Sequence, residues 1–241
     1  MSLEPMPLFW LALTLLAYLG SRWLYRRSKR YLLSPLILVP VLLLAVAVPL
    51  HTAYAEYARN THWLMSVLGP VTVAFAVPIW QQRAMLARHW PALMVGMVAG
   101  SSASIASSWG LAHLLALDSA TSLSLVPRSI TTPFAMPLAH DLGGVPELTA
   151  VFVMFTGVLG AMFGGVLLRW LPLRTPLARL RIAHDSDLPL ARGALFGVGA
   201  HGAGVSRAQE VGREEGSVAG LVMVLTGLLN LFAAPLLAML L

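Results

Sequence analysis

Six long apolar runs constrain this 241-residue chain more than any other feature. A helix needs about 20 apolar residues to cross the roughly 30 Å of hydrocarbon in a bilayer. The candidate spans are Leu8–Leu24, Leu32–Leu50, His62–Trp80, Ala92–Leu117, Leu148–Leu171 and Gly216–Leu241. Apolar residues make up 58% of the chain and charged residues 11%, against about 45–50% and about 25% in soluble domains. The sequence therefore predicts an all-α, polytopic membrane protein and excludes a soluble domain, a disordered chain and a nucleic-acid-binding domain.

The basic residues indicate how the chain would cross the membrane. The net charge of +6 falls in short clusters between the apolar runs, and loops rich in Lys and Arg stay on the cytoplasmic side. This rule places the cluster 22–30 and the loops 81–90 and 169–181 inside, and the loop 51–61 outside. Residues 118–169 must then cross an odd number of times. We therefore expect residues 122–144 to form a re-entrant hairpin and not a full span.

Three segments carry glycine and proline in places that a plain span would avoid. They are residues 62–80, 122–144 and 188–209. Their expected structural breaks are Gly69, Pro70, Pro78, Pro127, Pro133, Pro137 and Gly204. Broken backbone is tolerated at membrane depth only where it is buried in protein or lines a wet cavity. We therefore expect one transmembrane domain, residues 1–241, in which residues 1–60 form a peripheral scaffold and residues 61–241 the core. The remaining small residues we interpret as helix packing.

A short internal echo links two of the broken segments. Residues 75–78 (FAVP) resemble residues 134–137 (FAMP), and Thr72 corresponds to Thr131 at the same offset. Short Gly/Pro-interrupted segments at corresponding positions of two halves point to a transporter binding site. The echo predicts an internal repeat, which we take to be inverted, although the match itself does not show its orientation. The predicted architecture is six or seven full spans plus broken or re-entrant helices.

Three ordered blocks resemble a known family. Residues 68–78 (LGPVTVAFAVP) resemble its block LGPATVALAVP, and residues 127–135 (PRSITTPFA) resemble PKSVTTPIA. Residues 191–193 (ARG) and 200–208 (AHGAGVSRA) resemble its ARG…AHGIGTARA block. The chain is thereby similar to the LrgB/CidB family of antiholin-like membrane proteins, to which the plastid glycolate/glycerate translocator is related. Residues 1–60 match only in hydropathy. Arg128 stands where the family usually has Lys, and Ser206 where Thr is common, so a positive charge and a hydroxyl are kept.

The resemblance implies two different functions. Several relatives are associated with movement of small organic acids such as pyruvate, glycolate or glycerate, whereas the family name refers to lysis control beside holin-like partners. We expect a carrier of small monocarboxylates, coupled to protons or another ion, that works by alternating access. The alternative is an antiholin-like regulator of cell lysis and murein hydrolase export that acts with a small holin-like membrane protein of the LrgA/CidA type.

A carrier must offer a desolvated carboxylate hydrogen-bond donors and positive potential, because an isolated buried carboxylate is very costly. The N-termini of half-helices supply both, through free N–H groups and the helix dipole. The candidate substrate-binding residues, all in the three blocks, are Thr72, Arg128, Ser129, Thr131, Thr132, His201, Gly202, Ser206 and Arg207. The imidazole of His201 would also suit proton coupling, since histidine exchanges protons near neutral pH.

Each candidate also has a purely structural interpretation. The hydroxyls of residues 129–132 would cap their own broken backbone, and Arg128 would extend to the membrane interface. The His201 imidazole would donate to a backbone carbonyl, and Arg207 would pair with Glu210, three residues further along a helix. The sequence leaves both interpretations open.

We expect no enzymatic activity. Ser101 or Ser102 with His201 faintly resembles a Ser–His hydrolase pair, but no orienting third group is evident in the sequence. The chain has no cysteine, which excludes thiolate metal sites, and we expect no cofactor, no metal and no catalytic residue. The expected partners are a small organic acid, the lipid bilayer, a second copy in a homodimer and the holin-like protein, with no nucleic acid. The expected location is the bacterial inner membrane.

Overall fold

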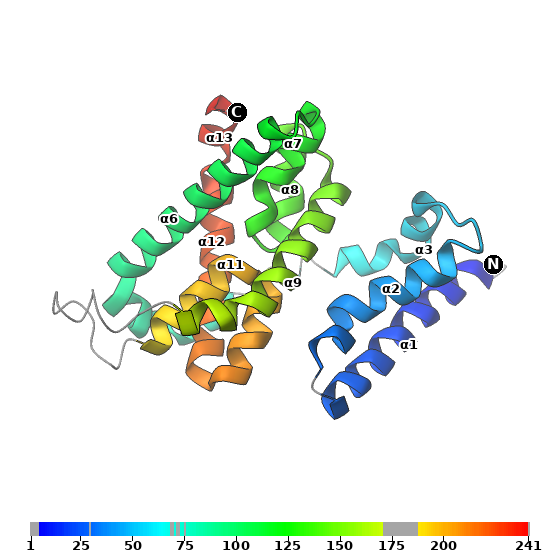
Figure 1. The fold of residues 1–241 in the computed structure, drawn as a ribbon, viewed down its shortest axis with the longest axis horizontal. Coiled ribbons are helices and arrows are strands. Elements are labelled where there is room, and N and C mark those ends of the chain that lie inside the picture. Colours follow the sequence, from blue (N-terminus) through cyan, green and yellow to red (C-terminus); the bar gives the residue numbers. More distant parts are fainter. Residues whose placement is uncertain are drawn as a thin grey trace. The chain divides into compact units, whose positions relative to one another are not determined.

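The computed structural model describes residues 5–28, 30–67, 70, 73–74, 76–170 and 188–240 (Figure 1). Every regular element in these ranges is a helix, so the predicted all-α class is confirmed. The chain folds as two units, residues 1–74 and residues 75–241. The sequence analysis drew the boundary between scaffold and core at residue 60.

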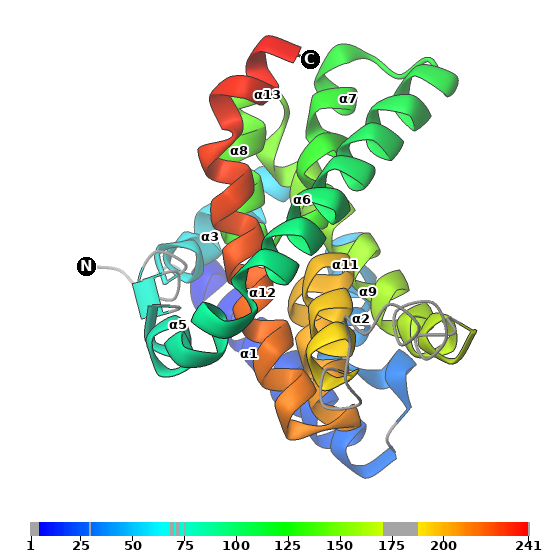
Figure 2. The same cartoon turned by 90° about the vertical axis from the view of Figure 1, so that its left-hand side faces the viewer.

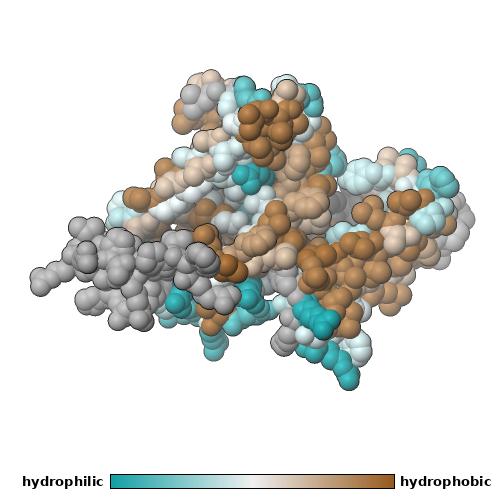
Figure 3. Space-filling view, viewed as in Figure 1, coloured by the Kyte–Doolittle hydropathy of each residue, from teal (hydrophilic) through white to brown (hydrophobic). Residues whose placement is uncertain are grey.

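The first unit contains α1 (Pro5–Ser28), a short 3₁₀ helix (Tyr31–Leu33), α2 (Pro35–Ala47) and α3 (Tyr54–Ser66). Trp10 on α1 is 1% exposed and packs edge-to-face on Tyr57 of α3, with ring centroids 5.4 Å apart. One turn along α1, the hydroxyl of Thr14 lies 3.2 Å from that of Tyr57. Large apolar side chains cover the outside of this unit, among them Leu16 and Leu44. In Figure 3, hydrophobic residues, coloured brown, cover large parts of the visible surface.

The second unit contains the remaining helices. They are α5 (Ala76–Gln81), α6 (Arg83–Leu114), α7 (Ser119–Leu125), the 3₁₀ helix η2 (Val126–Ser129), α8 (Thr132–Leu142), α9 (Pro146–Trp170), α11 (Leu188–Val211), α12 (Arg213–Phe232) and α13 (Ala234–Leu240). Helices α6 and α12 cross in the same direction (Figure 2), with Leu93 and Met97 packed in one apolar cluster with Val218 and Val222. Asn230, near the C-terminal end of α12, donates through its amide to the hydroxyl of Ser101 in the middle of α6 at 2.8 Å.

Four described helices are long and apolar enough to cross a membrane: α1 from Leu8, α6, α9 to Leu168, and α12. They support a membrane protein, whereas six or seven full spans stays a prediction. Three sequence boundaries are wrong. The predicted loop 81–90 is largely helical, because α6 begins at Arg83, and the predicted loop 51–61 contains the start of α3. The second apolar run forms only the 13-residue helix α2, about 20 Å long, which is short of the hydrocarbon thickness.

Residues 118–144 form a helical hairpin. Asp118 caps α7, accepting from the amide of Thr121 at 3.0 Å, and Pro127 kinks the chain before α8 returns. The amide of Val145, just after α8, donates to the Ser124 hydroxyl at 2.7 Å, and the Thr149 hydroxyl donates to the carbonyl of Ser124 at 2.9 Å. The far end of α8 therefore lies beside α7. Helices of seven and eleven residues are each too short to cross the hydrocarbon, and the re-entry of this segment into the membrane stays a prediction.

Helix α11 is a second hairpin. His201 has φ 42° and ψ −128°, and this non-helical residue divides the element in two. A Cβ atom on Gly204 would meet the carbonyl oxygen and carbon of Phe196, although eight residues span about 12 Å in a continuous helix. The chain therefore reverses at His201. Gly204, which the sequence analysis named as a break, lies in the returning helix and allows its close approach to the first half.

The two hairpins approach from opposite ends of the second unit. The first follows the C-terminal end of α6. The second leads into the N-terminal end of α12, where a Cβ on Gly193 would lie 2.7 Å from the Glu215 carbonyl oxygen. Because α6 and α12 run in the same direction, these are opposite ends. Helix α9 runs antiparallel to the first half of α11, with Gly160 against Ala200 and Gly164 against Phe196. The predicted repeat of residues 72–78 and 131–137 stays a prediction, since part of its first copy lies outside the described residues.

Candidate functional site

The tips of the two hairpins meet at Ser129 and His201. The 3₁₀ helix η2, which carries Arg128 and Ser129, packs against α11, and both residues lie close enough to His201 to influence its ring electrostatically. The histidine side chain is 3% exposed, and its Nε2 atom has no hydrogen-bond partner among the described residues. A Cβ on Gly157 of α9 would lie 3.5 Å from its Nδ1 atom. The imidazole is thus enclosed by one helix and the opposing tip.

Hydroxyl groups of α6 hold Arg128 in place. Its Nε atom donates to the Ser108 hydroxyl at 2.7 Å, and its Nη2 atom donates to the Ser107 hydroxyl at 3.1 Å. The Ser104 hydroxyl donates to that of Ser129 at 2.5 Å. Arg128 is half-buried and makes no ion pair in the described ranges of the chain.

Two grooves open onto Arg128. The first, here called the α6–α11 groove, has a volume of about 750 Å³. Its lining residues are Ala92, Leu93, Gly96, Met97, Gly100, Ala103, Ser104, Ser107, Arg128, Ser129, Thr156, Leu167, Ala191, Ala194, Leu195, Val198, Gly199 and Val222. The second, the α7–α9 groove, has about 410 Å³ and is lined by Leu111, Leu125, Arg128, Phe152, Phe155, Thr156, Leu159, Gly160 and Gly199.

The two grooves share Arg128, Thr156 and Gly199. From this shared point the α6–α11 groove extends toward the N-terminal end of α6, as far as Ala92. The α7–α9 groove extends toward its C-terminal end, to Leu111. The 19 residues between these two positions span about 28 Å of helix. The grooves therefore approach Arg128 from opposite ends of a helix long enough to cross the membrane.

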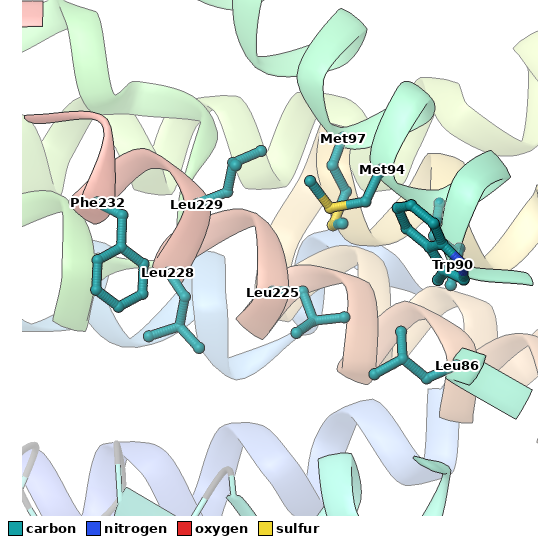
Figure 4. A pocket seen from close by; sticks show the side chains of 9 residues that line it. Leu86, Trp90, Met94, Met97, Leu225, Leu228, Leu229 and Phe232 are labelled. Atoms are coloured by element: carbon teal, nitrogen blue, oxygen red, sulfur yellow. The ribbon is translucent and has the colours of Figure 1, made fainter. Parts of the chain in front are cut away.

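A third groove differs in chemistry. It lies between α6 and α12, has a volume of about 480 Å³, and is lined only by apolar or aromatic residues (Figure 4). The lining side chains in Figure 4 include Trp90 and Met94 from α6 and Leu225 and Leu229 from α12. A groove without polar groups offers nothing to fix the orientation of a small charged ligand. The candidate site is therefore the meeting point of the other two grooves.

The structure brings some of the predicted residues together and separates others. Arg128 lines both grooves and Ser129 one, while His201 lies against Ser129 outside either lining. Thr131 is the N-cap residue of α8 and makes no side-chain capping bond, and neither it nor Thr132 is among the described lining residues. Residues Gly202, Ser206 and Arg207 lie on the returning half of α11, also outside both linings. Thr72 and Gly69 lie outside the described residues.

Two structural interpretations can be compared with the contacts. Arg207 does pair with Glu210, at 2.5 Å between Nη1 and Oε2, as its spacing predicts. Arg128 instead bonds Ser107 and Ser108 on α6, which is not the extended, solvated arrangement of an interfacial arginine. Sequence reasoning missed these serines and Thr156, because hydroxyls in an apolar run were interpreted as packing. Their recurrence at 104, 107 and 108, one helical face, was the available signal.

Comparison with known proteins shows the family of the chain. The model of the LrgB-like family matches residues 14–240. The chain belongs to the LrgB-like family. The match extends the resemblance to residues 14–60, where the sequence analysis found similarity only in hydropathy. No solved structure matches the chain.

Three bacterial relatives match nearly the whole LrgB-like chain. It is 35% identical to the protein YwbG of Bacillus subtilis over 225 residues, which are 93% of this chain and 94% of the relative. It is 33% identical to YxaC of the same organism over 224 residues, 93% of this chain and 92% of the relative. An antiholin-like protein LrgB, also from B. subtilis, is 29% identical over 230 residues, 95% of this chain and 94% of the relative.

Proposed function

We propose that this LrgB-like protein carries small monocarboxylates across the membrane by alternating access. The observation that supports the proposal is the pair of grooves that approach Arg128 from opposite ends of α6. A carrier needs one binding site that can be reached from either side of the membrane. Discontinuous helices that meet near the middle of the bilayer are where secondary transporters place such sites.

The charge at the meeting point suits an anion. Arg128 offers a guanidinium whose known partners are neutral hydroxyls, and arginine binds carboxylates through a planar pair of N–H donors. Helix α8 begins at Thr132 and the second half of α11 begins after His201, so two helix N-termini lie at the tips. The macrodipole gives each N-terminus a partial positive charge. A small carboxylate would therefore recover there much of the stabilisation that it loses on leaving water.

His201 is our candidate for the coupling group. An ionisable residue buried within a membrane is a functional candidate by default, and its Nε2 atom lacks a partner among the described residues. Protonation of the imidazole next to Arg128 would add positive charge at the tips when the anion is present. We propose that a proton accompanies the carboxylate. The inner membrane of a bacterium and a homodimeric assembly are part of the same proposal.

Uptake by the purified protein tests this function. We would reconstitute the full chain in liposomes and measure entry of radiolabelled pyruvate and glycolate. Arg128→Gln should reduce saturable uptake at least tenfold, while Arg128→Lys should keep part of it. Arg83→Gln is the matched control, since Arg83 stacks on Trp80 and lines neither groove. Equal uptake by Arg128→Gln and the unchanged protein would contradict the proposal, as would wild-type liposomes without saturable uptake.

An antiholin-like role is the second candidate, because relatives that match 95% of this chain carry that name. In that role the chain would control lysis together with a small holin-like membrane protein, and the grooves would be incidental. The two candidates differ in their dependence on Arg128. Autolysis of cells that express the chain with such a partner should be insensitive to Arg128→Gln if lysis control does not use the anion site.

A further inference from the structure

The α6–α11 groove is much larger than the acids proposed above. Its volume of about 750 Å³ equals roughly 25 water molecules at about 30 Å³ each, whereas pyruvate or glycolate would fill only its polar end. Pockets of about 300–1,000 Å³ normally hold ligands of drug size. The remaining volume is therefore large enough for a ligand bigger than pyruvate or glycolate.

Polar and apolar groups are sorted along this groove. Ser104, Ser107, Arg128 and Thr156 form one end, and from there the lining is apolar as far as Ala92 and Leu167. From Ser104 back to Ala92 the groove follows about 18 Å of α6. A ligand that fills it would carry one negative head and an apolar tail.

The apolar end is open. A Cβ on Gly96 would have no atom within 4 Å, and Ala92 and Ala191 are exposed on the facing helices. The apolar lining offers few hydrogen-bond partners to water. A hydrocarbon chain, in contrast, would bury its surface there at a gain of affinity with every methylene.

The depth of the polar end favours a small head group. Ser107 lies seven residues, about 10 Å of helix, from the C-terminal end of α6, and further from its N-terminal end. A phospholipid head would have to leave the interface to reach Arg128. A fatty acid has a head no larger than the carboxylate that the site is proposed to take, and one tail.

We propose that the α6–α11 groove binds a medium-chain fatty acid, with its carboxylate at Arg128 and its tail along α6 toward Ala92. This ligand class rests on the proposed function for its head group and adds the tail. Medium-chain acids would then compete with pyruvate for Arg128.

Two glycines of α6 allow a matched test. Gly96 lies in the apolar end of the groove, whereas Gly110 lines neither groove, and a Cβ at either position would meet no atom within 4 Å. Leucine at either site also favours the helix over glycine. We would measure saturable binding of radiolabelled decanoate to the full chain in neutral-lipid nanodiscs, and its displacement by pyruvate.

The expected result is tighter binding of decanoate than of butyrate, unchanged in Gly110→Leu and weakened at least tenfold in Gly96→Leu. Pyruvate binding should change less than twofold in either glycine variant. Arg128→Gln should bind neither decanoate nor pyruvate. Equal decanoate binding by Gly96→Leu and Gly110→Leu would overturn the tail site and leave the carrier intact. If decanoate still binds to Arg128→Gln, Arg128 does not bind the carboxylate and the proposed anion site is wrong. Loss of decanoate binding when phosphatidylglycerol replaces the neutral lipid would assign the groove to a phospholipid and also overturn the inference.

Discussion

The Nε atom of Arg128, at the tip of the first hairpin, donates to the Ser108 hydroxyl of α6 at 2.7 Å. Ser108 is fully buried. The hydrogen bond joins two side chains that are twenty residues apart in the chain. This bond fixes the direction of the guanidinium, so that its charge lies where the two grooves meet. The candidate site thus depends on a contact between the broken hairpin and the long helix before it.

Ser108→Ala should weaken the site without removing its charge. A buried donor left without its acceptor costs about 1–3 kcal/mol, and a guanidinium free to turn would bind a carboxylate less well. We expect the KM for pyruvate uptake to rise about tenfold, with a smaller change in kcat. Ser102→Ala on the exposed side of α6 is the control and should transport normally. A normal KM in Ser108→Ala would show that the bond does not position Arg128.

Gly160→Ala should destabilise the contact between α9 and α11. The added Cβ would lie 2.7 Å from the Cβ of Ala200 and 2.8 Å from the carbonyl oxygen of Gly199, so the helices must separate. Overpacking of this kind costs about 1–3 kcal/mol. Thermal unfolding in detergent measures the loss.

Gly165→Ala is the control on the same helix. Its Cβ would meet the Arg207 guanidinium at an ordinary 3.8 Å, and it gains the same helix propensity. If both alanine variants melt at the wild-type temperature, the close approach of α9 and α11 at Gly160 is incorrect.

The crossing of α6 and α12 should show a measurable polar coupling. Asn230 is buried and donates to the Ser101 hydroxyl and to the Thr226 carbonyl, both at 2.8 Å. Interhelical hydrogen bonds in membranes contribute about 0.6 kcal/mol on average and up to about 1.7 kcal/mol. A double-mutant cycle of Asn230→Ala and Ser101→Ala should return a coupling in this range. Additive effects would indicate that the two residues do not interact.

The first hairpin should lose stability in acid through Asp118. Hydrogen bonds from the hydroxyl and the amide of Thr121 lower the pKa of this exposed carboxyl below its ordinary value. A lowered pKa means that the stabilisation is present above the ordinary aspartate pKa and is lost as pH falls through the lowered one. Between about pH 5 and about pH 2 the melting temperature should therefore fall more steeply for the wild type than for Asp118→Asn. Parallel curves would rule out this contribution.

Hydropathy predicted the class of the fold but not the limits of its helices. A 20-residue window measures hydrocarbon thickness, and a helix can continue past it with polar residues. Helix α6 begins at Arg83, nine residues before the apolar run, and includes Pro91. The same method took residues 32–50 as a span, although apolar composition alone does not extend α2 beyond Ala47.

The break in α11 was predicted in the right segment and at the wrong residue. Gly204 was expected to interrupt the helix, since glycine is the usual residue at a break. The structure reverses at His201, which has positive φ, a conformation uncommon for any residue except glycine. A residue type other than glycine gives no local signal for such a reversal, so the sequence did not identify the position.

The candidate site was only partly visible in the sequence. Arg128 and Ser129 stood out because a charge and a hydroxyl follow a proline within an apolar segment. Thr156 and Gly199 did not, because each lies within an apolar or small-residue run and gains its place from the meeting of α9, α11 and η2. Predicting them would have required knowing that the two hairpins approach each other from opposite ends of the second unit.

Accessibility of Thr156 tests most directly whether one site is reached from both sides. Thr156 lines both grooves, and because the chain has no cysteine, Thr156→Cys introduces a single thiol. We would expose right-side-out and inverted vesicles to a membrane-impermeant thiol reagent, with and without pyruvate. The account predicts labelling from both sides and protection by pyruvate in both. Labelling from one side only, in both the presence and the absence of pyruvate, would contradict alternating access at Arg128.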